Sequence, residues 1–335
     1  GLSRCRRCRR EMACAMASGN FVPRRLRHGG QRLFAPRQLT SPSPLALCTR
    51  SFVDTHCHLD MLLPRLARES QRRARSAPQE AKPLSGDFEE WRKSLAEAEA
   101  EFEACVNIGC SASSLEAAAK FLRHDGVYGA FGIHPLNAQD WSDEVERALV
   151  AFMARPKVVA WGECGLDYYD KAAKGELSHG PTRDLQRRVF ERQLELAVPL
   201  GKPLVVHSRQ AEEDTLELLS RYLPEAHPVH VHCFTSSPAF AEKLLARFSR
   251  LRLGFTGVIT FKNAEHIREV VRATPLDRLL LETDGPYMAP VPFRGRIAHP
   301  GHVAYVARAV AEVKGVPLDD VLRACRSNTH CTYGF

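Results

Sequence analysis

Two histidines near residue 57 have the spacing of a metal-ligand pair. The segment DTHCHLD, residues 54–60, ends the first clear strand pattern in the chain. Because side chains alternate across a strand, His56 and His58 project from one face while Cys57 points to the other. Two neighbouring imidazoles can bind one divalent metal ion. With 14 histidines in the chain, such a pair arises by chance in about half of all chains of this composition, so its meaning depends on the other strand ends.

Further candidate ligands stand where other predicted strands end. Histidines without a function would be scattered over surfaces and loops, so this coincidence indicates a site. The segments are GIHP with His134, GECGLDYY with Glu163 and Asp167, VVHSR with His207 and Arg209, HVHCF with His230 and His232, and LLLETDGPY with Glu282 and Asp284.

The elements that would position these residues alternate along the chain. From residue 51, short apolar runs are followed by longer amphipathic ones. Eight strands that alternate with helices in this way predict an α/β (β/α)₈ TIM barrel, and the active site of such a barrel lies at the C-terminal ends of the strands. An open doubly wound sheet is the competing fold, but no Gly-x-Gly-x-x-Gly follows the first strand. The expected strands are 51–56, 104–108, 127–133, 157–163, 203–207, 228–232, 251–255 and 278–283. The expected helices are 112–123, 142–154, 183–198, 210–222, 236–247, 263–273, 301–313 and 317–325.

Positive charge is concentrated in the first 50 residues. These contain eleven Arg, no Lys and one acid, so they contribute about +10 to a net charge of +8 and leave about −2 for residues 51–335. Bulk charge therefore does not argue for DNA binding by the body of the chain. We interpret 1–50 as a basic, disordered leader with the composition of a mitochondrial or plastid transit peptide. A plain basic tail, or upstream sequence translated before Met12 or Met16, is the alternative.

The remaining composition indicates a soluble, intracellular protein. No apolar run approaches the roughly 20 residues of a membrane span, so no membrane contact is expected. Eleven scattered cysteines are typical of buried thiols in a reducing compartment. Without an organellar signal we expect the cytoplasm or nucleus, and no protein partner can be inferred.

One segment interrupts the first β–α unit. Residues 65–103 are too long and too charged for a usual connecting loop. Pro78, Pro83 and Gly86 break the segment, and the pattern over 87–103 predicts a solvated amphipathic helix. We expect an insertion at the barrel rim within the hydrolase domain 51–335, or alternatively an arm for a substrate or partner.

Five motifs make the chain resemble the TatD family of metal-dependent deoxyribonucleases. They are DTHCHLD, GECGLDYY, VVHSR, HCF and LLLETDGPY, in family order, and the resemblance runs from about Phe52 to the C-terminus. The segments GFTGVITF and RIAHPGHV resemble its eukaryotic branch. The chain departs from the family pattern at positions near a bound substrate, which are Leu136, Ser236, Gly285 and His299-Pro300.

The resemblance implies a barrel with two divalent metal ions (Mg²⁺, Mn²⁺ or Zn²⁺). Two such ions bring +4 against −2 from two carboxylates, and the net positive site would attract phosphate. A metal pair about 4 Å apart can lower the pKa of a water and stabilise both the attacking and leaving oxygens. The implied ligands are His56, His58, Asp284 and Glu163 for the first ion, with Glu163 bridging to a second ion held by His207 and His232.

Several neighbours have two open interpretations. His134 would hydrogen-bond the scissile phosphate or act as a general acid, or would only order water or cap its loop. Arg209 would bind phosphate or form a structural ion pair. His230 and Glu282 are expected behind the ligands, and Asp167 would orient a ligand or cap a turn. The aromatic rings could stack on nucleic-acid bases or simply pack within the fold; these residues are Tyr168, Tyr169, Phe234 and Tyr287.

We therefore expect a metal-dependent phosphodiester hydrolase acting on DNA, and possibly on RNA. The catalytic residues would be Glu163, His134 and Asp284, and the partner would be a nucleic acid. A small-molecule amidohydrolase is the first alternative, and it predicts an apolar-rimmed pocket instead of an open groove lined by Arg209, Arg294 and Arg296. A binding protein with weak catalysis, using the leader and the 65–103 segment, is the second alternative.

Overall fold

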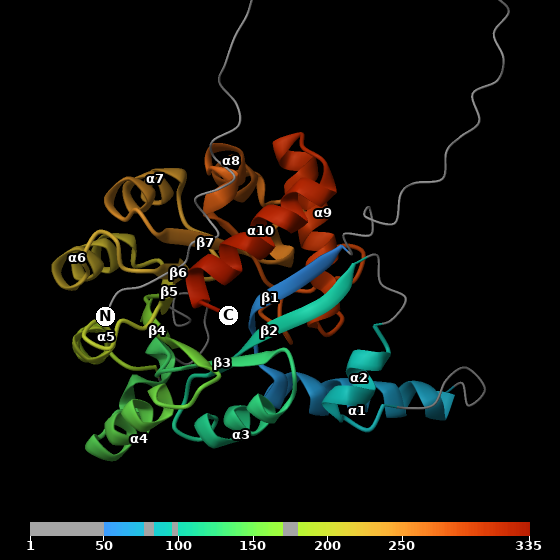
Figure 1. Cartoon of the computed structure of the whole chain (residues 1–335), viewed down its shortest axis with the longest axis horizontal. Helices are drawn as coiled ribbons and strands as arrows, with labels where there is room; N and C mark the ends of the chain where they lie inside the picture. Colours follow the sequence, from blue (N-terminus) through green and yellow to red (C-terminus); the bar gives the residue numbers. More distant parts are fainter. Residues whose placement is uncertain (1–49, 77–83, 96–99, 170–179) are drawn as a thin grey trace, which may run out of the picture. The chain divides into compact units, whose positions relative to one another are not determined.

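The computed structural model of the chain describes residues 50–76, 84–95, 100–169 and 180–335. Eight parallel strands form one sheet in sequence order, with helices around it (Figure 1), which confirms the predicted barrel. The leader 1–50 lies outside the described residues except for Arg50, and it stays a prediction. The strands are β1 (Ser51–Cys57), β2 (Glu101–Gly109), β3 (Val127–Phe131), β4 (Val158–Asp167), β5 (Leu204–Arg209), β6 (Val229–Val231), β7 (Leu251–Phe255) and β8 (Leu279–Leu281).

The helices pack their apolar sides on the outer face of the sheet. For example, α5 buries Val189, Phe190 and Leu194, and β4 is buried at every position. No described helix combines the length and apolar character that a membrane span requires. The α-helices are α1 (Leu59–Ser76), α2 (Phe88–Lys93), α3 (Leu115–Ala119), α4 (Asp143–Met153), α5 (Arg183–Ala197), α6 (Glu212–Tyr222), α7 (Pro238–Arg247), α8 (Glu265–Ala273), α9 (Val303–Lys314) and α10 (Leu318–Tyr333). The 3₁₀ helices are η2 (Lys120–Arg123), η3 (Pro135–Asp140), η5 (Gly257–Thr260), η6 (Leu276–Arg278) and η7 (Pro300–His302).

The segment after β8 returns to β1 and brings the two edges of the sheet together. The Asp284 N–H donates to the His56 carbonyl at 2.9 Å, and the His58 N–H donates to the Gly285 carbonyl at 2.8 Å. Buried Asp54 adds a side-chain link, because its carboxylate accepts the Thr283 N–H at 3.0 Å. This closure places the histidines of DTHCHLD directly beside Asp284.

The expected solvated helix over 87–103 is wrong. The helix α2 ends at Lys93 and β2 already begins at Glu101. Phe88 and Trp91 are only 1% and 2% exposed, because their rings pack with each other and with Phe102 at centroid distances of 5.6 to 6.3 Å. The described part of the 65–103 segment is therefore attached to the barrel through an aromatic cluster.

Candidate metal centre

The structure brings all six predicted ligands to one end of the barrel. Each stands within or just after a strand, at its C-terminal end, where parallel strands of a barrel present their side chains to a common site. Their elements are β1 for His56 and His58, β4 for Glu163, β5 for His207, β6 for His232 and β8 for Asp284.

Glu163 is the centre of the cluster. Its Oε1 lies 2.6 Å from His232 Nε2 and 2.9 Å from His207 Nδ1. Its Oε2 lies 3.4 Å from His56 Nε2, so the two oxygens face different histidines. Burial alone would raise the pKa of this carboxyl, which is 3% exposed, but the surrounding imidazoles hold its pKa well below the usual range. Glu163 is therefore a buried carboxylate anion with ligand groups on both sides.

The second part of the cluster joins β1 to the segment after β8. Asp284 Oδ1 lies 3.6 Å from His56 Nε2 and 3.5 Å from His58 Nε2. His56 is fully buried, and neither of its ring nitrogens has a hydrogen-bond partner among the described residues. Burial lowers the pKa of His56 to about 4, so the ring is neutral, which is the form that binds a metal.

Among the described residues, four sets of three have the spacing of a metal site, and two of them share Glu163. The other two are His56–His232–Glu282 and His134–Asp167–His207. Within each set that shares Glu163, His56–His58–Glu163 and Glu163–His207–His232, the candidate ligand atoms all lie within 4.8 Å of one another. Imidazole and carboxylate donors in such sets suit Zn²⁺, Mn²⁺ and Mg²⁺. The unpartnered nitrogens of buried His56 provide the structural sign that this site fits a cation.

A buried polar layer supports the cluster from the barrel interior. Glu282 Oε2 lies 2.9 Å from His230 Nε2, and His230 Nδ1 hydrogen-bonds the Tyr333 hydroxyl at 2.7 Å. The other oxygen of Glu282 accepts the Cys233 N–H, next to His232. Tyr333 reaches this layer from the end of α10, whose ribbon crosses the barrel in Figure 1. The sequence placed His230 and Glu282 behind the ligands but gave no signal for Tyr333 or Asp54.

Gly254 leaves the space that this layer occupies. A Cβ there would lie 2.7 Å from Glu282 Oε2 and even closer to His230 Nε2. We expect Gly254→Ala to lower the free energy of unfolding by about 1–3 kcal/mol, because overpacking forces the paired side chains apart. Chemical denaturation measures this change. Gly180→Ala is the matched control, since its Cβ would meet nothing nearer than 4.0 Å, and equal losses in both variants would contradict the prediction.

The predicted rim residues separate into two groups. Asp167 does both things left open for it: its carboxylate contacts His207 Nε2 at 3.1 Å and accepts the Tyr169 N–H at 3.0 Å. Arg209 is half exposed beside Asp167, at 3.9 Å, with its guanidinium over the Tyr169 ring. Tyr287 is 43% exposed and lies beside Arg65.

For two of the four aromatic residues the structure shows packing, one of the two uses left open. The Tyr168 hydroxyl donates to Asp214 at 2.6 Å, and Phe234 is buried between Phe240 and Phe255. The expected common groove of three arginines is wrong. Arg294 covers the Phe261 ring at 3.7 Å, and Arg296 lines a separate cavity beside α1. Residues beyond a strand end follow no periodicity, so their directions could not be predicted.

Comparisons with known proteins match both the sequence and the fold of this chain. A family model described as TatD related DNase matches residues 53–334. A human protein named 3′-5′ RNA nuclease TATDN2 is 40% identical over 288 residues, which are 84% of this chain but only 35% of the relative's length. The Bacillus subtilis protein YabD, named an uncharacterized metal-dependent hydrolase, is 38% identical over 206 residues, covering 61% of this chain and 76% of that protein. The crystal structure of YjjV, a TatD homolog from Escherichia coli, has a TM-score of 0.69 at 28% identity and covers 85% of this chain and 98% of its own.

Proposed function

Because the chain belongs to the TatD related DNase family, we propose that it is a divalent-metal-dependent nuclease that hydrolyses phosphodiester bonds of DNA or RNA. The match to the family model confirms the resemblance that the sequence motifs indicated. The observation that carries the proposal is the position of Glu163 between two sets of histidines, with the ligand atoms of each set all within 4.8 Å of one another. The names of the human and Bacillus relatives support a nuclease activity and a metal requirement respectively.

The proposed ligands divide between two ions. His56, His58 and Asp284 would hold the first, His207 and His232 the second, and Glu163 would bridge them. When bound, the ions would activate a water and neutralise charge on the phosphate. The chain's own contribution is orientation, because the Asp167 carboxylate fixes the ring of His207 and the Glu282 layer supports His232.

His134 is proposed as a hydrogen-bond donor to the substrate phosphate. Its Nδ1 accepts the Leu136 N–H at 3.0 Å, so this nitrogen carries no proton. The proton of the neutral ring is therefore on Nε2, which lies 3.3 Å from Glu163 Oε1 and faces the site. Burial lowers the pKa of His134 to about 3. The bond to Leu136 N–H also caps the loop after β3, which is the structural role left open from the sequence. Of the two catalytic roles, donation of a hydrogen bond fits these contacts better than general acid catalysis.

The two roles of His134 predict different activities for two variants. We expect His134→Ala to lower kcat about a hundredfold, because one donor to the developing negative charge is lost. His134→Gln should keep at least about a tenth of the activity, since its amide N–H can reach the position of Nε2. Initial rates on single-stranded substrates measure both. If the Gln variant is folded but as inactive as the Ala variant, the donor role is wrong and acid catalysis is favoured.

The mouth of the site supports a polymeric, anionic substrate. The guanidinium of Arg209 forms a long ion pair with Asp167 at 3.9 Å, which is the structural role left open for it. It is also half exposed, so it can turn its donors toward a phosphate. Exposed Tyr287 and half-buried Arg65 form a second pair, with the guanidinium 5.4 Å from the ring. The segments after β3 and β8 also expose Leu136 and Met288, so the rim combines apolar and basic side chains.

Cleavage of end-labelled single-stranded DNA and RNA tests the proposed function. The protein is stripped of metal, and Mg²⁺, Mn²⁺ or Zn²⁺ is then restored. Metal-dependent products on either strand support the proposal, and the product ladder reports whether cleavage starts from an end. Intact substrates under every condition would reject nuclease activity and favour the alternatives.

A mitochondrial or plastid destination is proposed for the leader 1–50. Its support is composition, with eleven Arg and one acid. Fusion of residues 1–50 to a fluorescent protein should send the fusion to the organelle, whereas a diffuse signal would identify a plain basic tail.

A further inference from the structure

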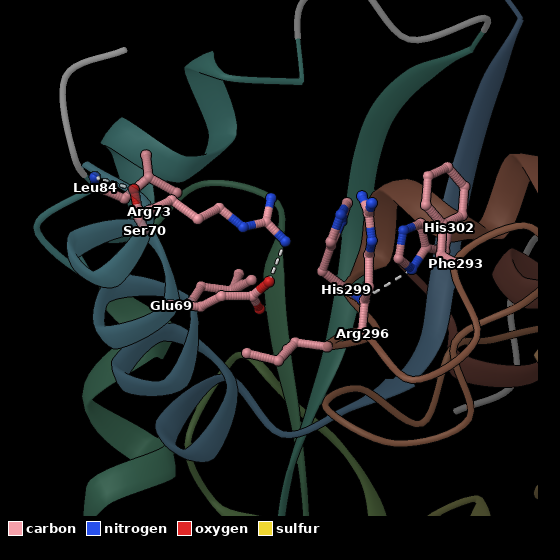
Figure 2. Close-up of a pocket in the computed structure, with 10 residues that line it drawn as sticks. Glu69, Ser70, Arg73, Leu84, Phe293, Arg296, His299 and His302 are labelled. Atoms are coloured by element: carbon pink, nitrogen blue, oxygen red, sulfur yellow. Dashed lines mark hydrogen bonds and ion pairs between the residues drawn. The ribbon is translucent and has the colours of Figure 1, made fainter. Parts of the chain in front are cut away.

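A basic cavity lies beside α1, separate from the candidate metal centre (Figure 2). Its volume is about 240 Å³, and it is bounded by the outer half of α1 and by residues 293–302. None of the six candidate ligands lines it. Figure 2 shows Arg73 extending from α1 toward the side chains of Arg296 and His299. We propose that this cavity binds a phosphate group of the nucleic-acid strand several nucleotides away from the bond that is cut, an inference that rests on the proposed nuclease function.

The charge of the cavity favours an anion. Arg73 forms an ion pair with Glu69, whereas Arg296 has no ion-pair partner in the described parts of the chain. The ionised side chains therefore leave one net positive charge. The Ser70 hydroxyl accepts the Leu84 N–H at 3.0 Å, and its own proton can be donated into the cavity.

Two histidines give the cavity neutral polar groups as well. Burial lowers the pKa of His299 to about 4 and that of His302 to about 3, so both rings are neutral. The Nδ1 of His299 is buried and has no hydrogen-bond partner among the described residues. A buried nitrogen without a partner costs free energy unless a ligand or water contacts it. Both rings lie in the RIAHPGHV segment, where His299-Pro300 departs from the general family pattern.

The position of the cavity identifies the anion as part of a strand. Helix α1 begins directly after His58, and Arg65, Glu69 and Arg73 recur at every fourth position on one face. At 1.5 Å per residue, Arg73 is about 22 Å beyond His58 along the helix axis. A nucleotide at the metal centre does not span that distance. A strand that leaves the site along α1 first meets Arg65 and exposed Tyr287, whose ring lies 5.4 Å from the guanidinium, and then the cavity.

The volume also suits a phosphodiester. A volume of 240 Å³ equals that of about eight liquid water molecules. This space exceeds what one phosphate needs and admits an attached sugar. Tyr287 can stack a base between the metal centre and the cavity, because an exposed aromatic ring accepts any base.

Substrate length tests the proposal. Arg296→Ala and Arg73→Ala should each raise KM about tenfold for a single strand of about 15 nucleotides, because one charge-assisted contact is lost. Neither variant should change kcat, nor the hydrolysis of a dinucleotide. The slope of log KM against log salt should fall by about 0.7 for the lost phosphate contact. Arg323→Ala is the matched control, since it removes an exposed arginine with a 70% exposed side chain on α10.

A binding measurement separates this inference from the proposed function. Fluorescence anisotropy of the same labelled strand in chelator requires no cleavage. If the wild-type protein binds the strand but cleaves nothing, the nuclease proposal fails, while weaker binding by the two arginine variants still supports the cavity. If both variants bind and cleave the long strand as the wild type does, the cavity does not hold the strand and the proposal is overturned.

Discussion

Replacing Glu163 with Gln is expected to abolish metal binding and to reduce nuclease activity by about 10³-fold or more. The amide has the size of the carboxylate, so the barrel should fold, but it lacks the negative charge that lies between His56, His207 and His232. Loss of a preorganised electrostatic group alone costs about 10²–10³ in rate, and here the same group also holds both ions. Metal content by mass spectrometry and cleavage of single-stranded substrates measure the two effects.

A surface variant provides the control for Glu163→Gln. Glu146 on α4 forms an ion pair with Arg192 at 2.6 Å, away from the candidate ligands, and Glu146→Gln should keep metal and activity. Thermal unfolding identifies any loss that comes from misfolding. A folded Glu163→Gln protein with its metal content and rate unchanged would show that Glu163 does not bridge the ions.

Strand periodicity and barrel topology predicted that the histidines and carboxylates at the strand ends meet, and the family resemblance selected the six candidate ligands among them. In a parallel barrel, every C-terminal strand end opens on the same site, so His56, Glu163 and His207 converge although they are more than 40 positions apart in sequence. The strand order needed no further information. The end of β4 was predicted at residue 163, whereas the strand continues to Asp167, because two glycines interrupt the apolar pattern there.

The supporting groups could not be predicted because they come from contacts between distant elements. Asp54 reads as one more polar residue of DTHCHLD, yet its carboxylate binds Thr283, 229 positions away, and links the two edges of the sheet. Tyr333 meets His230 across 103 positions because its side chain, at the end of α10, packs among residues of the barrel strands. No local pattern encodes either contact. The same limit explains Phe88 and Trp91, whose burial depends on Phe102 in the next strand.

The wild-type protein is expected to bind two divalent ions per chain, and His58→Ala and His207→Ala to bind one each. The two histidines lie on opposite sides of the cluster. His58 contacts Asp284 at 3.5 Å, whereas His207 contacts Glu163 at 2.9 Å and Asp167 at 3.1 Å. Each variant should lose about 10²-fold or more in rate, because a two-ion site needs both ions to stabilise the attacking and leaving oxygens. Equilibrium dialysis followed by metal analysis gives the stoichiometry.

Thermal stability provides an independent measure of the binding of these ions. A ligand that binds only the folded state adds about 2.7 kcal/mol at a concentration one hundred times its Kd. Chelation should therefore lower the Tm of the wild-type protein more than that of either single variant, and it should leave the Tm of Glu163→Gln nearly unchanged. The double variant His58→Ala/His207→Ala should be no less active than Glu163→Gln, since groups that act as a unit are not additive. If the wild-type protein binds only one ion and both single variants lose it equally, the two-ion proposal is wrong. The cluster is then a single metal site around Glu163.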